Sequence, residues 1–329
     1  MTLPGAVITG WGTALPDTVV TNAQLEARLD TTDEWIVTRS GIRERHIGGT
    51  VSTLAIDAGR RALERAGLAP EQVDLLVLAT CTPDLAVPAT SAAVHFALGL
   101  SGGAFDVNAA CAGFVYALVA AHGAISCGAA HRVLVIGADC VSLLTDPDDR
   151  ATAVLFADGA GAVVLEPSDD DGLLAVDFGV DGSAHDLLTC AHGGYMEMEG
   201  KEVFRRAVRT TVDSASRALE RANLTPDDVA LFVPHQANLR IIQAVASRLG
   251  VPMQRVAVVV DRTGNTSSAS VPLALADASD AGRLRPGDHV LMSGFGAGMT
   301  WASTVVRWHV DTADGLAPTA SPGTQGGKR

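Results

Sequence analysis

Two stretches of the chain repeat one pattern of apolar and polar positions. They are ALERAGLAPEQVDLLV at residues 62–77 and ALERANLTPDDVALFV at residues 218–233. In each stretch, apolar residues at helical spacing end at a stop signal, Gly67 or Asn223, and a proline turn leads into a run of apolar residues. This order predicts a helix, a turn and a buried strand in both places. The pattern indicates a duplicated α/β unit.

Later segments extend the repeat. HRVLVIGAD (131–139) is similar to DHVLMSGFG (288–296), and alternating apolar segments follow both, at 156–166 and 298–308. Such alternation is typical of antiparallel strands that complete a mixed sheet. The stretch 111–130 is apolar on nearly every side, which indicates a helix enclosed by protein. We predict an α/β fold with two mixed five-stranded sheets and helices between and outside them, in αβαβα layers.

The repeat divides the chain into an N-terminal half (1–170) and a C-terminal half (171–311). The remaining segment, 312–329, is rich in Gly, Pro, Thr and Ser and has almost nothing to bury, so we expect a disordered tail. The apolar stretches fall short of the ~18 residues that a membrane span needs, and the start lacks the basic segment of a signal peptide. We expect a cytoplasmic protein with no membrane contact.

Composition argues against further classes. The formal net charge of −13 makes nucleic acid an improbable partner, because neutralising phosphates requires a basic surface. The five cysteines are odd in number and scattered, without a C-x-x-C pair. This spacing indicates neither a disulfide framework nor a zinc site, so we expect reduced thiols and no metal.

Cys111 is the candidate nucleophile. It lies in DVNAACAGF (106–114), where small neighbours leave room for a bulky thioester. Its predicted place is the first turn of the enclosed helix, where free N–H groups and the helix dipole favour a thiolate. Most free cysteines are packing residues, and we interpret Cys81, Cys127 and Cys140 in that way.

Three further segments supply groups that a thiol nucleophile needs. His235 comes directly after a predicted strand, whereas the other histidines, His192 among them, have patterns typical of surface or ordinary helix positions. Asn265 lies in DRTGNTSSAS (261–270), which taken alone predicts a turn and a helix cap. The glycines of GFGAGMTW (294–301) allow backbone N–H groups to approach a ligand oxygen, as an oxyanion hole requires.

Seven segments in order resemble β-ketoacyl-acyl-carrier-protein synthase III of the thiolase superfamily. They are DEWIVTRSGIRERHI (33–47), DVNAACAGF (106–114), DPDDRATAVLFADGAGA (146–162), EVF (202–204), PHQANLRII (234–242), GNTSSASVP (264–272) and GFGAGMTW (294–301). The resemblance covers about residues 3–309 and implies a thiolase-like duplicated fold. It also implies a decarboxylative Claisen condensation of an acyl-coenzyme A primer with malonyl-acyl-carrier protein. The products are β-ketoacyl-acyl-carrier protein, coenzyme A and CO₂, and the reaction initiates fatty acid synthesis.

The resemblance assigns the catalytic roles. Cys111 carries the acyl group, and the backbone N–H groups of Cys111 and Ala297 hold the thioester oxygen. His235 and Asn265 stabilise the enolate that forms when malonyl-carrier protein loses CO₂. Neither a metal nor a permanently bound cofactor is implied, since acyl-coenzyme A is a substrate.

The resemblance also assigns substrate-binding residues and a partner subunit. Trp35 and Arg150 sandwich the adenine of coenzyme A, whereas Arg39, Phe204 and Asn238 line the pantetheine tunnel. Arg205, Arg240 and Arg248 face the acidic carrier protein. The family is homodimeric, and a loop matching Ala86, Val87 and Pro88 closes the acyl pocket of the partner subunit.

Two departures from the family pattern bear on the substrate. Ala297 is the middle residue of the Gly-rich loop, and it narrows the space around the oxyanion slightly. Val87 replaces an aromatic residue of acetyl-specific members, which favours a branched or longer primer. Two alternatives stay open: a specialised primer synthase or acyltransferase of polyketide or secondary metabolism, and a non-catalytic scaffold that binds coenzyme A or carrier protein.

Overall fold

The computed structural model describes residues 5–169 and 172–311 of the chain. The predicted tail, 312–329, lies outside these ranges, as do residues 170 and 171, where the two predicted halves meet. None of the described helices is long and apolar enough to cross a membrane.

The first sheet has five strands in the order β1-β7-β6-β4-β5. They are β1 (Gly5–Ala14), β7 (Asp158–Ser168), β6 (Val133–Cys140), β4 (Leu75–Ala79) and β5 (Gly103–Val107). β7 is antiparallel to both β1 and β6, and β4 is parallel to both β6 and β5. The sheet is therefore mixed, as predicted.

The second sheet repeats this order with β8-β13-β12-β11. They are β8 (Leu173–Val180), β13 (Thr300–Arg307), β12 (His289–Gly296) and β11 (Val229–Pro234). β13 is antiparallel to both neighbours and β11 is parallel to β12, so each pairing matches the corresponding pairing in the first sheet. The duplication read from the sequence is confirmed at the level of topology.

The second sheet differs from the prediction by one strand. At the fifth place, the described chain forms only a single parallel bridge between Val256 and Phe232. The reason is the side chain of Gln236, whose Oε1 accepts the backbone N–H groups of Val259 (2.9 Å) and Val260 (3.2 Å). Those donors are therefore not available to extend a ladder along β11.

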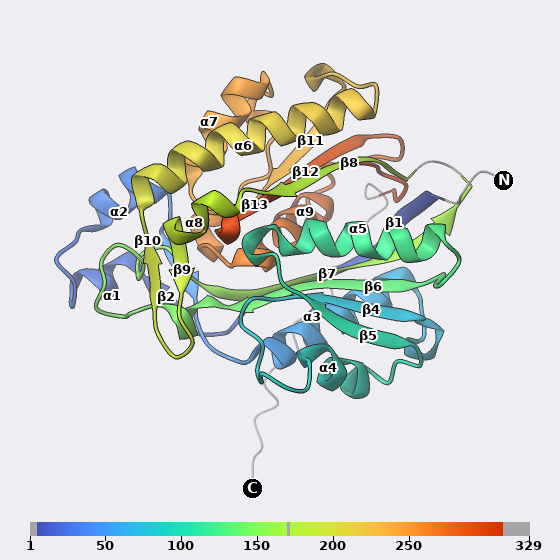
Figure 1. Cartoon of the computed structure of the whole chain (residues 1–329), viewed down its shortest axis with the longest axis horizontal. Helices are drawn as coiled ribbons and strands as arrows, with labels where there is room; N and C mark the ends of the chain where they lie inside the picture. The colour runs from blue at the N-terminus through green and yellow to red at the C-terminus, as the bar shows by residue number, and fades with distance from the viewer. Residues whose placement is uncertain (1–4, 170–171, 312–329) are drawn as a thin grey trace, which may run out of the picture.

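The helices form the predicted layers (Figure 1). α5 (Gly113–Ser126) and α9 (Ser270–Asp280) lie between the two sheets. α3 (Val51–Ala66) and α4 (Thr90–Leu98) pack on the outer face of the first sheet. α6 (Gly200–Arg221) and α7 (Leu239–Leu249) pack on the outer face of the second. A central core of α5, α9 and the inner faces of both sheets holds the halves together.

Local signals end the outer helices where the sequence predicts. α3 ends before Gly67, which adopts the left-handed conformation at φ 67°, and a turn at Pro70–Gln72 leads into β4. In the repeat, Asn223 takes the same role after α6 at φ 55°. Because a left-handed residue closes the helix in both halves, β4 and β11 enter their sheets in the same way.

Smaller elements surround one end of the sheets. They are β2 (Val19–Thr21), α1 (Asn22–Glu26), α2 (Asp33–Ser40), β3 (Glu44–His46), β9 (Leu188–Cys190), β10 (Met196–Met198) and α8 (Val260–Thr263). β2 pairs with β3 and β9 pairs with β10 as two short hairpins. The carboxyl ends of β4, β5, β11 and β12 face this end, which is where sites form in α/β folds.

Candidate active site

Cys111 lies in a tight turn between β5 and α5. A 3-10 turn at Ala110–Ala112 follows the strand, and α5 begins at Gly113, two residues after the thiol. Ala110 adopts a left-handed conformation at φ 47°, which is unfavourable for a residue with a side chain. Its N–H donates to Oδ1 of Asn108 at 3.1 Å. The turn presents the sulfur just before the helix rather than within its first turn.

The resting thiol of Cys111 is protonated. Burial raises its pKa to about 12, whereas a hydrogen bond with the Ser267 hydroxyl acts in the opposite direction. The expectation that the helix start favours a thiolate is therefore wrong for the resting enzyme, because desolvation of the charged form outweighs it. A thiol with this pKa can act as a nucleophile only if it loses its proton in the same step.

His235 directly follows β11, as predicted, and its ring is oriented by Ser270. Nδ1 lies 2.6 Å from the Ser270 hydroxyl, which also accepts the N–H of Gln236 at 3.2 Å. The hydrogen of the Ser270 hydroxyl finds its acceptor in Nδ1. Because Nδ1 accepts this bond, it carries no proton, and the proton of the neutral ring is on Nε2. Burial lowers the pKa of His235 to about 3. The imidazole is neutral at physiological pH and has an Nε2–H donor to offer.

Asn265 is fixed by both its backbone and its side chain. Its N–H donates to Leu155 O and its carbonyl accepts the N–H of Ala157, each at 2.9 Å. Its Oδ1 accepts the N–H of Ser267 at 3.0 Å, which leaves Nδ2 as the donor for a substrate. Gly264 precedes it at φ 68°, and a Cβ there would lie 2.8 Å from that of Ala157. Only glycine fits this approach.

The three predicted catalytic side chains line one cavity. Cys111, His235 and Asn265 border a space of about 100 Å³. Phe204 and Asn238, predicted for the pantetheine tunnel, line the same cavity. The structure therefore places the three predicted residues, which come from both halves of the chain, around one cavity.

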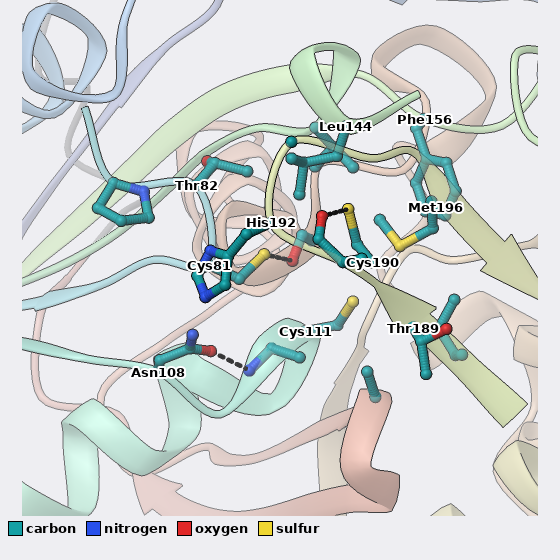
Figure 2. Close-up of a pocket in the computed structure, with 18 of the residues that line it drawn as sticks. Cys81, Thr82, Asn108, Cys111, Leu144, Phe156, Thr189, Cys190, His192 and Met196 are labelled. Carbon is teal, nitrogen blue, oxygen red and sulfur yellow. Dashed lines mark hydrogen bonds between the residues drawn. The ribbon is translucent and has the colours of Figure 1, made fainter. Parts of the chain in front are cut away.

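Cys111 also borders a second, larger cavity of about 520 Å³ (Figure 2). Its walls include Leu144, Phe156, Leu188 and Met196. His235 and Asn265 do not line it, in contrast to the smaller cavity. The sulfur thus lies between a cavity that His235 and Asn265 line and a second, mainly apolar cavity.

The Gly-rich loop lies directly against the Cys111 turn. A Cβ on Gly296 would be 2.5 Å from the backbone nitrogen of Cys111, so only a glycine permits this approach. The hydroxyl of Thr300 donates to the carbonyls of Ala109 (2.8 Å) and Ala297 (3.0 Å). These contacts hold the segment of Ala297 beside the turn that carries the nucleophile.

The residues predicted to bind adenine lie together outside both cavities. The guanidinium of Arg150 stacks 5.0 Å from the Trp35 ring centroid, and that of Arg39 lies 5.9 Å from it. Asn238 connects this group to the smaller cavity, because its Nδ2 donates to Arg39 O at 3.0 Å while its Oδ1 caps α7. An adenine ring would have to enter between Trp35 and Arg150.

The residues predicted to meet the carrier protein are exposed but not equivalent. Arg240 stacks 5.6 Å from the ring of Phe204, which lines the smaller cavity. Arg205 makes two hydrogen bonds to Glu202, at 2.6 and 2.9 Å, so its charge is partly compensated. Arg248 lies in the last turn of α7, about two helical turns from Arg240.

Several site residues were missed or misread from the sequence. Cys81, interpreted as a packing residue, lines the larger cavity with its Sγ 3.6 Å from the Ser267 hydroxyl. His192 is exposed, as expected, but also lines this cavity, together with Cys190. Cys127 is exposed rather than packed. The only sequence signal that could have placed Cys81 at a site is its position shortly after β4. No local pattern indicates that Cys190 lines a cavity.

Comparisons with known proteins agree with this geometry. Two family models match: 3-oxoacyl-[acyl-carrier-protein] synthase III at residues 105–182 and its C-terminal counterpart at 219–308. The chain is 51% identical to the β-ketoacyl-[acyl-carrier-protein] synthase III of Roseiflexus sp. (strain RS-1), over 92% of this chain and 98% of the relative.

Two solved structures share the fold. The 3-oxoacyl-[acyl-carrier-protein] synthase III of Aquifex aeolicus VF5 superposes with a TM-score of 0.91 at 44% identity, covering 92% of this chain and all of that one (100%). The priming β-ketosynthase of the R1128 polyketide pathway superposes with a TM-score of 0.90 at 40% identity, covering 94% and 98%.

Proposed function

The chain belongs to the 3-oxoacyl-[acyl-carrier-protein] synthase III family, and on that basis we propose that it condenses an acyl-coenzyme A primer with malonyl-acyl-carrier protein to initiate fatty acid synthesis. The observation that carries the proposal is the convergence of Cys111, His235 and Asn265 on one cavity. The second cavity beside Cys111 supplies room for the primer.

In the first half-reaction, the Cys111 sulfur attacks the thioester of acyl-coenzyme A. A new sulfur–carbonyl bond forms, the bond to coenzyme A breaks, and the thiol proton passes to the leaving sulfur. The negative charge on the thioester oxygen is stabilised by the N–H groups of Cys111 and Ala297, each worth roughly 3 kcal/mol in comparable sites. The Ser267 hydroxyl stabilises charge that develops on sulfur.

In the second half-reaction, the malonyl thioester of the carrier protein enters the smaller cavity, and its carboxylate leaves as CO₂. The electron pair of the broken bond becomes an enolate, whose oxygen accepts hydrogen bonds from Nε2 of His235 and Nδ2 of Asn265. A neutral His235 suits this role, because a donor is needed and no proton is consumed in decarboxylation. The carbanion then attacks the acyl group and releases the Cys111 sulfur, which takes a proton from water.

The primer occupies the larger cavity. One buried water needs roughly 10–15 Å³ of accessible cavity volume, so a cavity of about 520 Å³ accepts a chain well beyond acetyl. Its walls combine the thiols of Cys81 and Cys190 with the larger side chains of Leu144, Phe156, Leu188 and Met196. We therefore favour a branched or longer primer.

A homodimer completes the acyl pocket. β5 is an edge strand with one unpaired side, and large apolar side chains are exposed near it, including Phe96 (87%), Val87 (84%) and Phe105 (39%). Exposed apolar groups beside an open strand edge favour association with a second copy. The loop that contains Val87 and Pro88 would then face the partner's larger cavity.

Coenzyme A and the carrier protein use the outer residues. Adenine binds between Trp35 and Arg150, and Arg39, Phe204 and Asn238 follow the pantetheine arm. Arg205, Arg240 and Arg248 attract the acidic carrier protein, which offsets the acidic net charge of −13. Coenzyme A is a substrate rather than a bound cofactor, and a cytoplasmic location stays a prediction.

The two alternatives are less well supported. Curated relatives at 47% to 51% identity are named β-ketoacyl-[acyl-carrier-protein] synthase III, whereas the polyketide priming enzyme is 40% identical. A scaffold without catalysis has no need of three reactive side chains in one cavity.

A condensation assay tests the function. Acetyl-, isobutyryl- and octanoyl-coenzyme A are each supplied with malonyl-carrier protein, and the β-ketoacyl product is measured by mass spectrometry. We expect condensation, with isobutyryl or octanoyl primer faster than acetyl, and we expect His235→Ala and Asn265→Ala to retain acyl transfer while losing decarboxylation. Binding of coenzyme A without product from any primer would favour the scaffold, and a preference for acetyl would overturn the primer assignment alone.

A further inference from the structure

Arg45 is a fully buried cation in β3 that lines neither cavity. In the described part of the chain, its hydrogen-bond partners are the carbonyls of Val20 (3.1 Å) and Val154 (2.9 Å) and Oδ1 of Asn22 (2.8 Å). None of these partners is a carboxylate. Desolvation lowers the pKa of Arg45 to about 10, so it stays protonated at neutral pH. The charge of Glu44 acts on Arg45, but no carboxylate of the described residues bonds to the guanidinium, and a buried charge held in this way calls for an explanation.

The bond to Val154 leads directly to Asn265. Phe156, two residues after Val154, forms a parallel bridge with Asn265, through the bonds of Leu155 O and the N–H of Ala157 to the Asn265 backbone. The segment 154–157 is therefore held by the Arg45 guanidinium at Val154 O and by the backbone of Asn265 at Leu155 O and the N–H of Ala157.

A second set of contacts connects β3 to the same loop. A Cβ on Gly264, the residue before Asn265, would lie 2.9 Å from Cβ of Arg45. The N–H of Arg43, the residue before β3, donates to the carbonyl of Asp261 in α8 at 2.8 Å. Arg45 thus contacts the Asn265 loop in two ways. Its Cβ lies close to Gly264, and its guanidinium bonds to Val154 O in the segment that pairs with Asn265.

The other end of the network reaches α2. Nδ2 of Asn22 donates to Asp33 Oδ1 at 2.7 Å and to Ile42 O at 2.9 Å. Asp33 is in the first turn of α2, the helix that carries Trp35 and Arg39. One buried guanidinium therefore joins α2, which carries the predicted coenzyme A residues Trp35 and Arg39, to the loop of Asn265.

We propose that Arg45 is a positioning residue for Asn265. The planar guanidinium of Arg45 fixes segment 154–157, and this segment places the Asn265 amide for the enolate. The expected effect on the decarboxylation rate rests on the proposed function. The expected effect on the order of the Asn265 loop does not depend on that function. A guanidinium spans three acceptors in one plane, whereas an ammonium is a compact donor on a flexible stem. Misplacement of a catalytic donor by about 1 Å can reduce a rate about 100-fold.

The test is Arg45→Lys with Arg217→Lys as the matched control. Arg217 lies away from the cavities and forms two hydrogen bonds to the carboxylate of Asp177, at 2.8 and 2.9 Å. Its replacement by lysine therefore also removes a bidentate guanidinium contact. We expect Arg45→Lys to decarboxylate malonyl-carrier protein about 10- to 100-fold more slowly, with acyl transfer to Cys111 within about twofold of wild type. Arg217→Lys is expected to leave the ratio of the two half-reactions unchanged.

Hydrogen–deuterium exchange supplies a readout that does not depend on activity. Arg45→Lys is expected to accelerate exchange in peptides covering 154–158 and 262–268, and not in the peptide covering 106–112. Equal loss of both half-reactions, or unchanged exchange at 262–268, would overturn the proposal. If wild type shows neither half-reaction, the proposed function falls while the exchange result still decides the role of Arg45.

A second variant covers the case in which Arg45→Lys does not fold. Asn22→Ala removes one partner of the guanidinium and leaves the charge and the Val154 contact in place. We expect a smaller effect in the same direction, a decarboxylation rate reduced about threefold to tenfold with acyl transfer retained. Wild-type rates for both half-reactions in this variant would contradict the network.

Discussion

The hydroxyl of Ser270 lies 2.6 Å from Nδ1 of His235. Ser270 begins α9 in the layer between the sheets, whereas His235 follows β11, so the contact ties the imidazole to the centre of the fold. Because the hydroxyl satisfies Nδ1, the proton of the neutral ring is on Nε2 and is available to the enolate.

Ser270→Ala should therefore reduce malonyl decarboxylation about tenfold and leave acyl transfer nearly unchanged. The loss of one orienting hydrogen bond allows the ring to rotate or to change tautomer. Ser279→Ala is the matched control, since its hydroxyl bonds only to Leu275 O within the same helix at 2.8 Å. Stopped-flow measurement of each half-reaction checks the prediction, and a wild-type decarboxylation rate in Ser270→Ala would refute the assigned tautomer.

Gly296→Ala should slow acylation of Cys111 by about 100-fold. The added Cβ would lie 2.5 Å from the backbone nitrogen of Cys111, so the turn that supplies the oxyanion donor must move. Gly123→Ala is the control, because a Cβ at that position in α5 meets no atom within 4 Å apart from its own helix backbone. Burst kinetics with acyl-coenzyme A measure the effect, and equal bursts for the two variants would exclude close approach of the loop as a requirement.

The free energy of unfolding should depend on pH through two groups, His235 on the acid side and Cys111 on the alkaline side. The folded protein holds the pKa of His235 at about 3, below its ordinary 6.5, so the unfolded chain binds more protons between these values. The free energy of unfolding should then fall as pH decreases through this window, by roughly 1.4 kcal/mol per pH unit from this group. Urea unfolding of wild type and His235→Asn measures the difference, and parallel curves from pH 4 to 7 would contradict a neutral buried ring.

The thiol gives the reverse dependence. Folding raises the pKa of Cys111 from 9.0 to about 12, so the unfolded chain loses its proton first as pH rises. Its contribution to stability is complete below pH 9 and is lost between about 9 and 12. Cys111→Ala should therefore lose less stability than wild type as pH rises from 8 to 10.

The repeat and the layers could be predicted because they depend on local spacing. The pattern around Gly67 and Asn223 fixes a helix end and a strand start wherever it occurs. Cys111 and His235 stand at segment boundaries where α/β folds gather functional groups, whereas the role of Asn265 was assigned by the resemblance to the family. Their convergence on one cavity follows from the matched topology of the two halves.

Other features depend on contacts between distant segments and have no local signal. Gln236 prevents a fifth strand in the second sheet by accepting N–H groups from residues more than twenty positions away. Cys81 lines a cavity together with Ser267, a residue 186 positions away whose hydroxyl lies 3.6 Å from its sulfur. The raised pKa of Cys111 likewise reflects burial by the assembled fold, which the helix pattern alone does not reveal.

The central claim is that Cys111 carries the primer, and peptide mass spectrometry after incubation with acyl-coenzyme A tests it most directly. Cys81→Ala and Cys190→Ala serve as controls, because both thiols line the same cavity. We predict one acyl group per chain on the peptide that contains Cys111, present in both controls and absent in Cys111→Ala. An acyl group on Cys81 or Cys190 of the wild-type protein, or labelling that persists in Cys111→Ala, would contradict the account.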